Sequence, residues 1–368
     1  MNNTKTSLNE KSQYKPYISG LKGFACIMVM VGHYLGLFRY AEEVPNQISL
    51  LNKLFSSKAG FVISESFWLY LFFVVSGYLA AQSSIRKFRE FIEKCILRFL
   101  RLGFPILCAY LIIYLISISV GFHNSGTANL FTNTWFQNAY EQRQYSPTDV
   151  LLSPFYVLIL GKCSLNSPYW VLREMFIASA AIYLITYLRQ KLPTLKKWID
   201  LLCLGFAVFG HLISPTVSAC IAGMIVCRFE NVSQEFCRSR LFAFCAIGLS
   251  LTMYVLPRTQ ISCLFFSSLI LFIPKTKIIR SLFSSKAAVF LGKISFGIYS
   301  FHWPLLCSVG ALIMLSADSR EQFVPCLFAA MGSCVVLTLL LSIAYNITFE
   351  RLSTCLIRRI KSLFEKAR

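Results

Sequence analysis

Charged residues are scarce in this sequence, and acidic residues are the scarcest of them. Charged side chains make up 14% of the 368 residues, and 16 Asp and Glu stand against 36 Lys and Arg. Hydrophobic residues account for 56% of the chain, and the mean hydropathy is +0.61. A water-soluble protein of this length carries more charge and has shorter apolar runs. The composition therefore excludes an ordinary soluble protein.

Long apolar runs recur along the whole chain and are separated by short basic clusters. Runs of about 15 to 22 apolar residues are typical of helices that cross a bilayer. We predict ten such spans, at 17–38, 61–82, 103–121, 168–188, 199–212, 214–229, 241–256, 260–273, 296–316 and 323–345. The sequence thus predicts an all-α fold, a polytopic membrane bundle of about ten transmembrane helices.

The basic residues, which give the chain a net charge of +20, fall mainly in alternate loops. With the N-terminus inside, about 28 of the 36 Lys and Arg lie on the inner side. The inner loops are then 83–102, 189–198, 230–240, 274–295 and the tail from Glu350. This positive-inside pattern predicts an even number of spans with both termini in the cytoplasm. A nucleic-acid-binding protein would gather its basic residues in one patch, so we expect no nucleic-acid partner.

Neither a disulfide framework nor a metal site is predicted. Most of the 14 cysteines lie inside apolar runs, where a thiol behaves as a small hydrophobic group. Only Cys163 falls in a predicted outer loop. The histidines and cysteines show no spacing typical of zinc ligands. No small-residue cleavage site follows the first span, so we interpret Tyr17–Phe38 as a retained helix and not as a signal peptide.

We expect one membrane-embedded domain over residues 1–368, without a fused extracytoplasmic domain. Its parts are a cytoplasmic segment at 1–16, the helix bundle at 17–345 and a basic cytoplasmic tail at 346–368. Basic and apolar residues alternate at helical spacing in Ser84–Pro105, which predicts an amphipathic helix on the inner surface. The longest outer loop, Gly121–Ser167, is rich in amides and aromatic residues, which suit sugar contacts as well as an ordinary interfacial loop.

Ionisable residues occur inside or beside several of the predicted spans. Lys22 and His33 lie eleven positions apart in the first span, about 16 Å along a helix. Arg98 and Arg101 in "RFLR" share one helical face. Because an ionisable side chain in a membrane segment is costly, it usually faces a partner or a cavity. Further such residues are Arg173 and Glu174 in "SPYWVLREMF" and His302 in "LGKISFGIYSFHWPLL".

These stretches resemble, in order, the motifs of the acyltransferase 3 family of integral-membrane acyltransferases, which modify bacterial cell-surface glycans. Lys22 and His33 match its basic-x10-His signature, and "FFVVSGY" matches its Phe-x-x-x-Ser-Gly motif. "RFLR" matches Arg-x-x-Arg, and "YWVLRE" matches a Trp-x-Leu-x-x-Glu-like motif. The late stretch is similar to Gly-x-x-Ser-Tyr-x-x-Tyr-x-x-His-x-Pro, with Phe296 where Tyr is more usual. The resemblance covers residues 17 to about 345.

The resemblance implies transfer of an acyl group, usually acetyl from cytoplasmic acetyl-CoA, to a hydroxyl of a glycan or lipid-linked glycan. Such a reaction needs a base, and we assign that role to His33, with Glu174 holding its imidazole. For the phosphates and thioester of acetyl-CoA we expect Arg98, Arg101, Lys22, Ser76 and Tyr78. For the acceptor we expect Trp170, Tyr169, Arg173, His302 and Tyr299. The residues leave open whether the acyl group is carried briefly on His33 or transferred directly.

The predicted function is therefore that of a multi-pass O-acetyltransferase of the bacterial inner membrane, with lipopolysaccharide O-antigen as the first choice of acceptor. Structural roles remain open for the same residues. Lys22 would serve as a topology anchor, Arg98 and Arg101 as ligands of lipid head groups, and Ser76 and Gly77 as small residues of a helix contact. The functional alternatives are a flippase or transporter of lipid-linked sugars, and acyl transfer to an exopolysaccharide, peptidoglycan or a small molecule.

Overall fold

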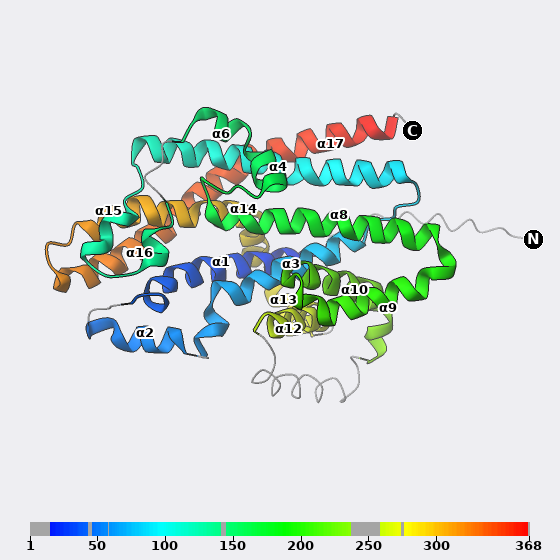
Figure 1. Ribbon diagram of the computed structural model, residues 1–368, viewed down its shortest axis with the longest axis horizontal. Coiled ribbons are helices and arrows are strands. Elements are labelled where there is room, and N and C mark those ends of the chain that lie inside the picture. The colour runs from blue at the N-terminus through cyan, green and yellow to red at the C-terminus, as the bar shows by residue number, and fades with distance from the viewer. Residues whose placement is uncertain are drawn as a thin grey trace, which may run out of the picture.

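The computed structural model describes residues 15–42, 46–57, 59–140, 145–236, 258–273 and 276–366. Every regular element within these ranges is a helix (Figure 1). The predicted all-α fold is therefore confirmed. The predicted span at 241–256 lies outside the described residues, so the structure does not bear on it.

The longer helices form one bundle. They are α1 (Pro16–Arg39), α3 (Glu65–Ala81), α4 (Phe88–Ser119), α8 (Trp170–Lys191), α9 (Lys196–Phe209), α10 (Pro215–Phe236), α12 (Arg258–Phe272), α14 (Lys286–Leu305), α16 (Arg320–Tyr345) and α17 (Arg351–Lys366). Short helices connect or extend them: η1 (Asn46–Ile48), α2 (Ser49–Ser56), η2 (Ala59–Ile63), η3 (Asn124–Asn129), α5 (Thr134–Gln137), α6 (Pro147–Leu151), α7 (Ser153–Phe155), η4 (Tyr156–Leu160), η5 (Ser167–Tyr169), η6 (Pro193–Leu195), η7 (Gly210–Leu212), α13 (Lys277–Ser284), η10 (Leu306–Gly310), α15 (Ala311–Leu315) and η11 (Asn346–Glu350).

Five helical stretches of the described residues are long and apolar enough to cross a membrane. They are Pro16–Arg39, Phe88–Ser119, Ser167–Lys191, Lys286–Leu315 and Gln322–Lys366. Two shorter apolar helices, Glu65–Ala81 and Pro215–Arg228, lie among them. The chain is thus a polytopic membrane protein, while the number of about ten spans stays a prediction.

The predicted separation of an amphipathic surface helix from the third span is wrong. Ser84–Pro105 and 103–121 belong largely to one continuous helix, α4, which runs through Pro105. Proline in a helix removes one backbone hydrogen bond and introduces a local clash, but neighbouring elements can compensate for both. The carbonyl of Pro105 itself accepts from the Tyr345 hydroxyl at 2.8 Å, so α16 contacts α4 beside the proline.

Glycines bring the central helices into close contact. A side chain at Gly23 of α1 would collide with the backbone of Gly292 on α14, and one at Gly77 of α3 would collide with the Cys220 carbonyl on α10. Small residues allow such approach between membrane helices. Gly77 therefore has the packing role that the sequence left open for it, and α1 is fixed against α14 along its length.

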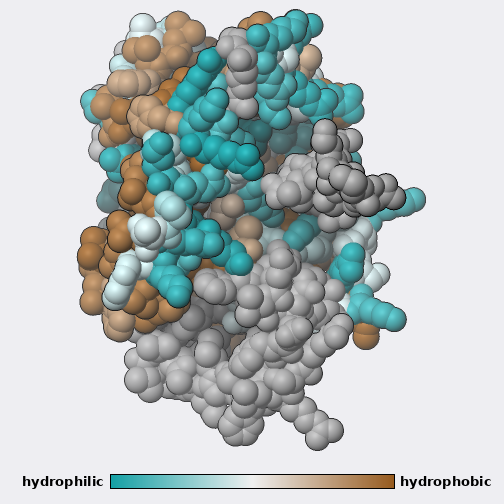
Figure 2. Space-filling model, turned by 90° about the vertical axis from the view of Figure 1, so that its right-hand side faces the viewer, coloured by the Kyte–Doolittle hydropathy of each residue, from teal (hydrophilic) through white to brown (hydrophobic). Residues whose placement is uncertain are grey.

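Side-chain contacts distinguish the two ends of the bundle. At one end Lys15, just before α1, donates to the hydroxyl of Tyr78 near the end of α3. At the other end Arg39 forms an ion pair with Glu65 of α3 at 3.1 Å. The helix α17 ends on the side where α4 begins and α8 ends (Figure 1). Figure 2 views the molecule from that side, where hydrophilic residues gather beside a hydrophobic flank. That this end is cytoplasmic remains a prediction.

Candidate active site

Two histidines from opposite ends of the sequence meet inside the bundle. The Nδ1 atom of His33 on α1 lies 2.9 Å from the Nε2 atom of His302 on α14. His302 is fully buried, whereas His33 is partly accessible. The close packing of α1 on α14 described above sets this distance. Both residues were predicted site residues, but a separation of 269 positions gave no sign that they touch.

The hydrogen bonds of His302 define which nitrogen of His33 is available. The Nδ1 atom of His302 lies 2.9 Å from the carbonyl oxygen of Ile298, and a carbonyl can only accept. His302 Nδ1 therefore carries the proton, and in the neutral ring Nε2 accepts from His33 Nδ1–H. His33 is left with an unprotonated Nε2. A lone pair held in a fixed direction is what a general base requires.

Two tryptophan rings lie against the imidazole of His33. Trp135 of α5 stacks on the imidazole with a centroid distance of 6.1 Å, and Trp303 lies at 5.4 Å. The two indoles also contact each other at 4.7 Å. Asn133 fixes the loop that carries Trp135, because its amide donates to the carbonyls of Gly36 and Leu37 at 3.3 and 3.1 Å. These aromatic residues come from the predicted outer loop and from α14.

A loop segment before α8 holds α14 in place. Pro304 has no N–H, so the carbonyl of Ser300 lacks its donor within the helix. The amide of Asn166 supplies this hydrogen bond at 2.9 Å. Tyr169 donates to the Ser300 hydroxyl at 2.6 Å, and the Tyr299 hydroxyl donates to the Pro168 carbonyl. Tyr169 and Tyr299, predicted to bind the acceptor, thus join the segment to α14.

Asn166 was not among the predicted site residues. The signal that points to it is Pro304, because a proline inside a helix leaves one carbonyl that needs an outside donor. Sequence reasoning identifies the orphaned carbonyl but not its partner, which lies 134 positions away.

Glu174 does not contact His33, contrary to the prediction. Its carboxylate accepts a hydrogen bond from Thr216 at 2.9 Å and lies 3.5 Å from the guanidinium of Arg173. Thr216 belongs to α10, so the side chain of Glu174 faces that helix and not α1. His302 provides the imidazole contact that we had assigned to the carboxylate. Glu174 stays a candidate residue without an established role.

The other predicted acceptor residues lie apart from the histidines. Trp170 is 45% exposed, and its ring packs against Phe73 at 6.3 Å. Arg173 lies against Gly161, and its Nε atom is buried without a hydrogen-bond partner among the described residues. The described contacts of Trp170 and Arg173 thus do not include either histidine.

The residues predicted for the acyl donor lie toward the beginning of α1. The guanidinium of Arg98 donates to the Ser76 hydroxyl at 2.8 Å, and its Nε atom is buried without a partner among the described residues. Lys22 lies close enough to Arg98, Arg101 and Glu350 for their charges to act on it. Arg101 is exposed. The structure therefore brings Lys22, Arg98, Arg101 and Ser76 into one neighbourhood, while Tyr78 pairs with Lys15.

A match between the sequence and a family model shows which family the chain belongs to. Within the described ranges, no three His, Cys, Asp or Glu side chains are grouped as ligands of a metal ion. Neither a curated protein nor a solved structure matches the chain. A family model does: that of the acyltransferase 3 family, described as an acyltransferase domain, matches residues 15–343. Because this match covers nearly the whole chain, the protein belongs to the acyltransferase 3 family of membrane acyltransferases.

Proposed function

We propose that the protein transfers an acetyl group from cytoplasmic acetyl-CoA to a sugar hydroxyl of a bacterial surface polysaccharide, with lipopolysaccharide O-antigen as the first candidate acceptor. The observation that supports this function best is the contact between His33 and His302. It presents an unprotonated nitrogen to a site lined by aromatic residues, and acyl transfer to a hydroxyl needs such a base.

In this reaction Nε2 of His33 takes the proton of the acceptor hydroxyl while the hydroxyl oxygen forms a bond to the acetyl carbonyl carbon. The bond between that carbon and the CoA sulfur then breaks, and the proton on Nε2 passes to the departing thiolate. His302 accepts from Nδ1–H throughout, so it keeps the ring oriented and favours the transient imidazolium. The atoms and charges balance without a further reactant.

The donor would approach from the end where Lys22, Arg98 and Arg101 gather. CoA carries several phosphates, and the planar fork of Arg suits phosphate oxygens. Lys22 and His33 lie eleven positions apart on α1, so one helix would connect the anionic part of the donor with the reacting group. This arrangement favours a transferase over a flippase, which would need no binding site for a donor.

Nuclear magnetic resonance of isolated surface polysaccharide tests the proposal. Cells would express the wild type, His33→Ala, Arg98→Ala or His211→Ala at matched membrane levels, the last being a histidine remote from the site. We expect O-acetyl signals with the wild type and His211→Ala, and their loss with His33→Ala and Arg98→Ala. Acetylation that persists in His33→Ala would exclude this residue as the base. Wild-type cells without any acetyl signal across several hosts would contradict the proposed acceptor.

A further inference from the structure

A cavity lies in the segment between α4 and α8, away from the two histidines. Its volume is about 550 Å³, and its lining residues are Tyr145, Asp149, Tyr156, Lys162, Cys163 and Ser164. Among the described residues, the lining therefore combines one cation, one carboxylate and several hydroxyl groups. A volume in this range fits a small-molecule ligand.

The segment next to this cavity lies at the depth of the apolar part of α4. Pro154 of α7 is packed so closely on Gly103 that a side chain added at Gly103 would meet it at 3.0 Å. From Leu102 to Ser119 the helix α4 contains no charged residue. Within the predicted outer loop Gly121–Ser167, α6 and α7 pack along the spanning helix α4, so this part of the loop lies beside α4. Non-helical backbone at this depth occurs where protein or a polar cavity satisfies it.

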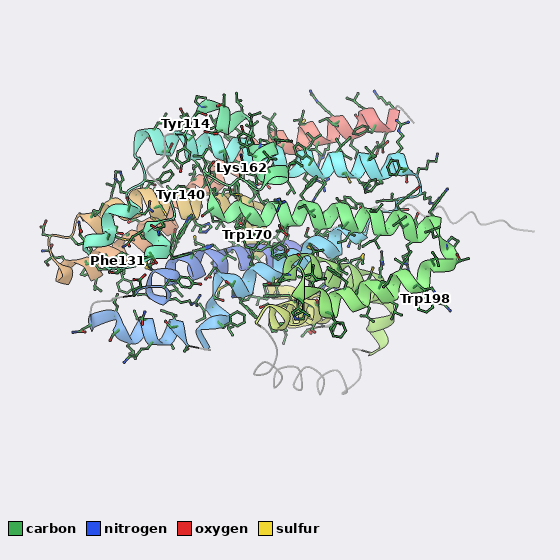
Figure 3. All side chains as sticks on the ribbon, viewed as in Figure 1. Tyr114, Phe131, Tyr140, Lys162, Trp170 and Trp198 are labelled. Carbon is green, nitrogen blue, oxygen red and sulfur yellow. The ribbon has the colours of Figure 1, made fainter. Side chains whose placement is uncertain are left out.

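The outward side of the same segment is apolar. Leu151, Leu152, Phe155, Ile159 and Leu160 are each more than 40% exposed. Beside a spanning helix, such residues face lipid chains. A polar cavity with Lys162 and Asp149 therefore adjoins a lipid-facing surface, and ionisable groups in this setting usually mark a ligand site. In Figure 3 Lys162 lies near the ribbon of α4, above the beginning of α8.

Backbone continuity joins the cavity to the histidine pair. Ser164 lines the cavity, and its carbonyl accepts from the Tyr145 hydroxyl at 3.3 Å. Two residues later, Asn166 donates to Ser300 on the helix that carries His302. The segment Ser164–Asn166 thus lines the cavity at its first residue and hydrogen-bonds to α14, the helix of His302, at its last.

We propose that this cavity binds the phosphate-bearing head of a membrane lipid to which the acceptor glycan is attached. Lys162 pairs with the phosphate, the Tyr and Ser hydroxyls bind sugar hydroxyls, and the exposed apolar residues contact the lipid chain. Asp149 is compatible with this ligand because Ser146 donates to one of its oxygens through both its N–H and its hydroxyl, at 3.0 and 2.9 Å. The proposal rests on the acyl-transfer function, and it specifies that the acceptor enters sideways from the bilayer.

Binding to the purified full chain in phosphatidylcholine nanodiscs tests this site without any acyl donor. The probe is a polyprenyl phosphate that carries one N-acetylglucosamine, and native mass spectrometry reports the bound fraction. We expect Lys162→Gln to weaken binding at least about tenfold, because a hydrogen bond to a charged group is lost. The matched control is Lys191→Gln, an exposed lysine at the far end of α8, which should bind as the wild type does. Ser164→Trp, which fills the cavity, should also abolish binding.

Three competitors identify the source of the phosphate. Phosphatidylglycerol, the polyprenyl alcohol without phosphate and the soluble sugar phosphate without lipid should each bind at least about tenfold more weakly than the probe. Equal binding by any of them overturns the proposal, as does equal binding of the probe to Lys162→Gln and the wild type. If the probe binds as expected but no acetyl transfer occurs in cells, the proposed function fails and this site stands.

Discussion

The amide nitrogen of Asn166 lies 2.9 Å from the carbonyl oxygen of Ser300, the one carbonyl that Pro304 leaves without a helical donor. Both groups are buried, so water cannot replace this hydrogen bond. The position of His302, two residues after Ser300, thus depends on a side chain from the loop before α8.

Asn166→Ala should therefore destabilise the protein and reduce transfer. A buried carbonyl that loses its partner costs about 1–3 kcal/mol. Pro304→Ala restores a backbone N–H four residues after Ser300, so the double variant should regain much of the lost stability. Thermal unfolding of the purified protein, arranged as a double-mutant cycle, measures the coupling. Additive effects of the two substitutions would contradict the proposed relation between these residues.

His302 should influence the rate through the orientation of His33. In His302→Leu the hydrogen bond to His33 Nδ1 is lost, and misplacement of a reacting group by about 1 Å can cost about 10²-fold in rate. His302→Gln offers an amide oxygen that can accept from Nδ1–H, so it should retain more activity than His302→Leu. Initial rates of acetyl transfer in membranes, at matched protein levels, compare the two variants. Equal loss in both would show that side-chain shape at position 302 matters and hydrogen bonding does not.

The packing of α3 on α10 should not tolerate a methyl group at Gly77. Its Cβ would collide with the backbone of Cys220, which cannot move as a flexible side chain can. Overpacking of this kind typically costs about 1–3 kcal/mol. Gly205 of α9 is the matched control, since an added Cβ there meets no atom within 4 Å. Gly205→Ala should be neutral or stabilise the helix by up to about 1 kcal/mol, and melting curves of both variants test the contrast.

Labelling of Cys163 tests both the membrane orientation of the chain and the burial of this thiol. Burial raises the pKa of its thiol to about 11, so the reactive thiolate is rare at neutral pH. Below that pKa the thiolate fraction grows about tenfold with each pH unit, and labelling by a maleimide should accelerate accordingly between pH 7 and pH 9. In intact cells an impermeant maleimide should label Cys163 and spare Cys355, which is exposed on α17. Cys163→Ser and Cys355→Ser identify the labelled positions, and labelling of Cys355 in intact cells would reverse the predicted orientation.

The helical fold could be predicted because apolar runs and basic clusters are local features of the sequence. The same holds for Lys22 and His33, whose spacing lies within one helix. The partner of His33 could not be predicted in this way. A carboxylate is the usual partner of a catalytic imidazole, yet Glu174 turns to Thr216, and His302 approaches from a helix far along the chain.

Helix packing explains the other differences between the predicted and the observed structure. Helical periodicity assigns Arg98 and Arg101 to one face, but the contact of Arg98 with Ser76 and the exposure of Arg101 depend on how α3 and α4 each pack on α8. The segment from Pro147 to Leu160 has no sequence period that distinguishes a surface loop from a chain packed along a spanning helix. Its path follows from Gly103, which leaves room for Pro154.

The hydrogen bond between Asn166 and Ser300 also bears on the order in which the protein is assembled. Synthesis proceeds from the N-terminus, so the segment around Asn166 leaves the ribosome 134 residues before Ser300 does. When α14 enters the bilayer with its unpaired carbonyl, the group that pairs with it is already present. The late helix can therefore complete its hydrogen bonding as it arrives, instead of waiting in lipid for a donor that has yet to be made.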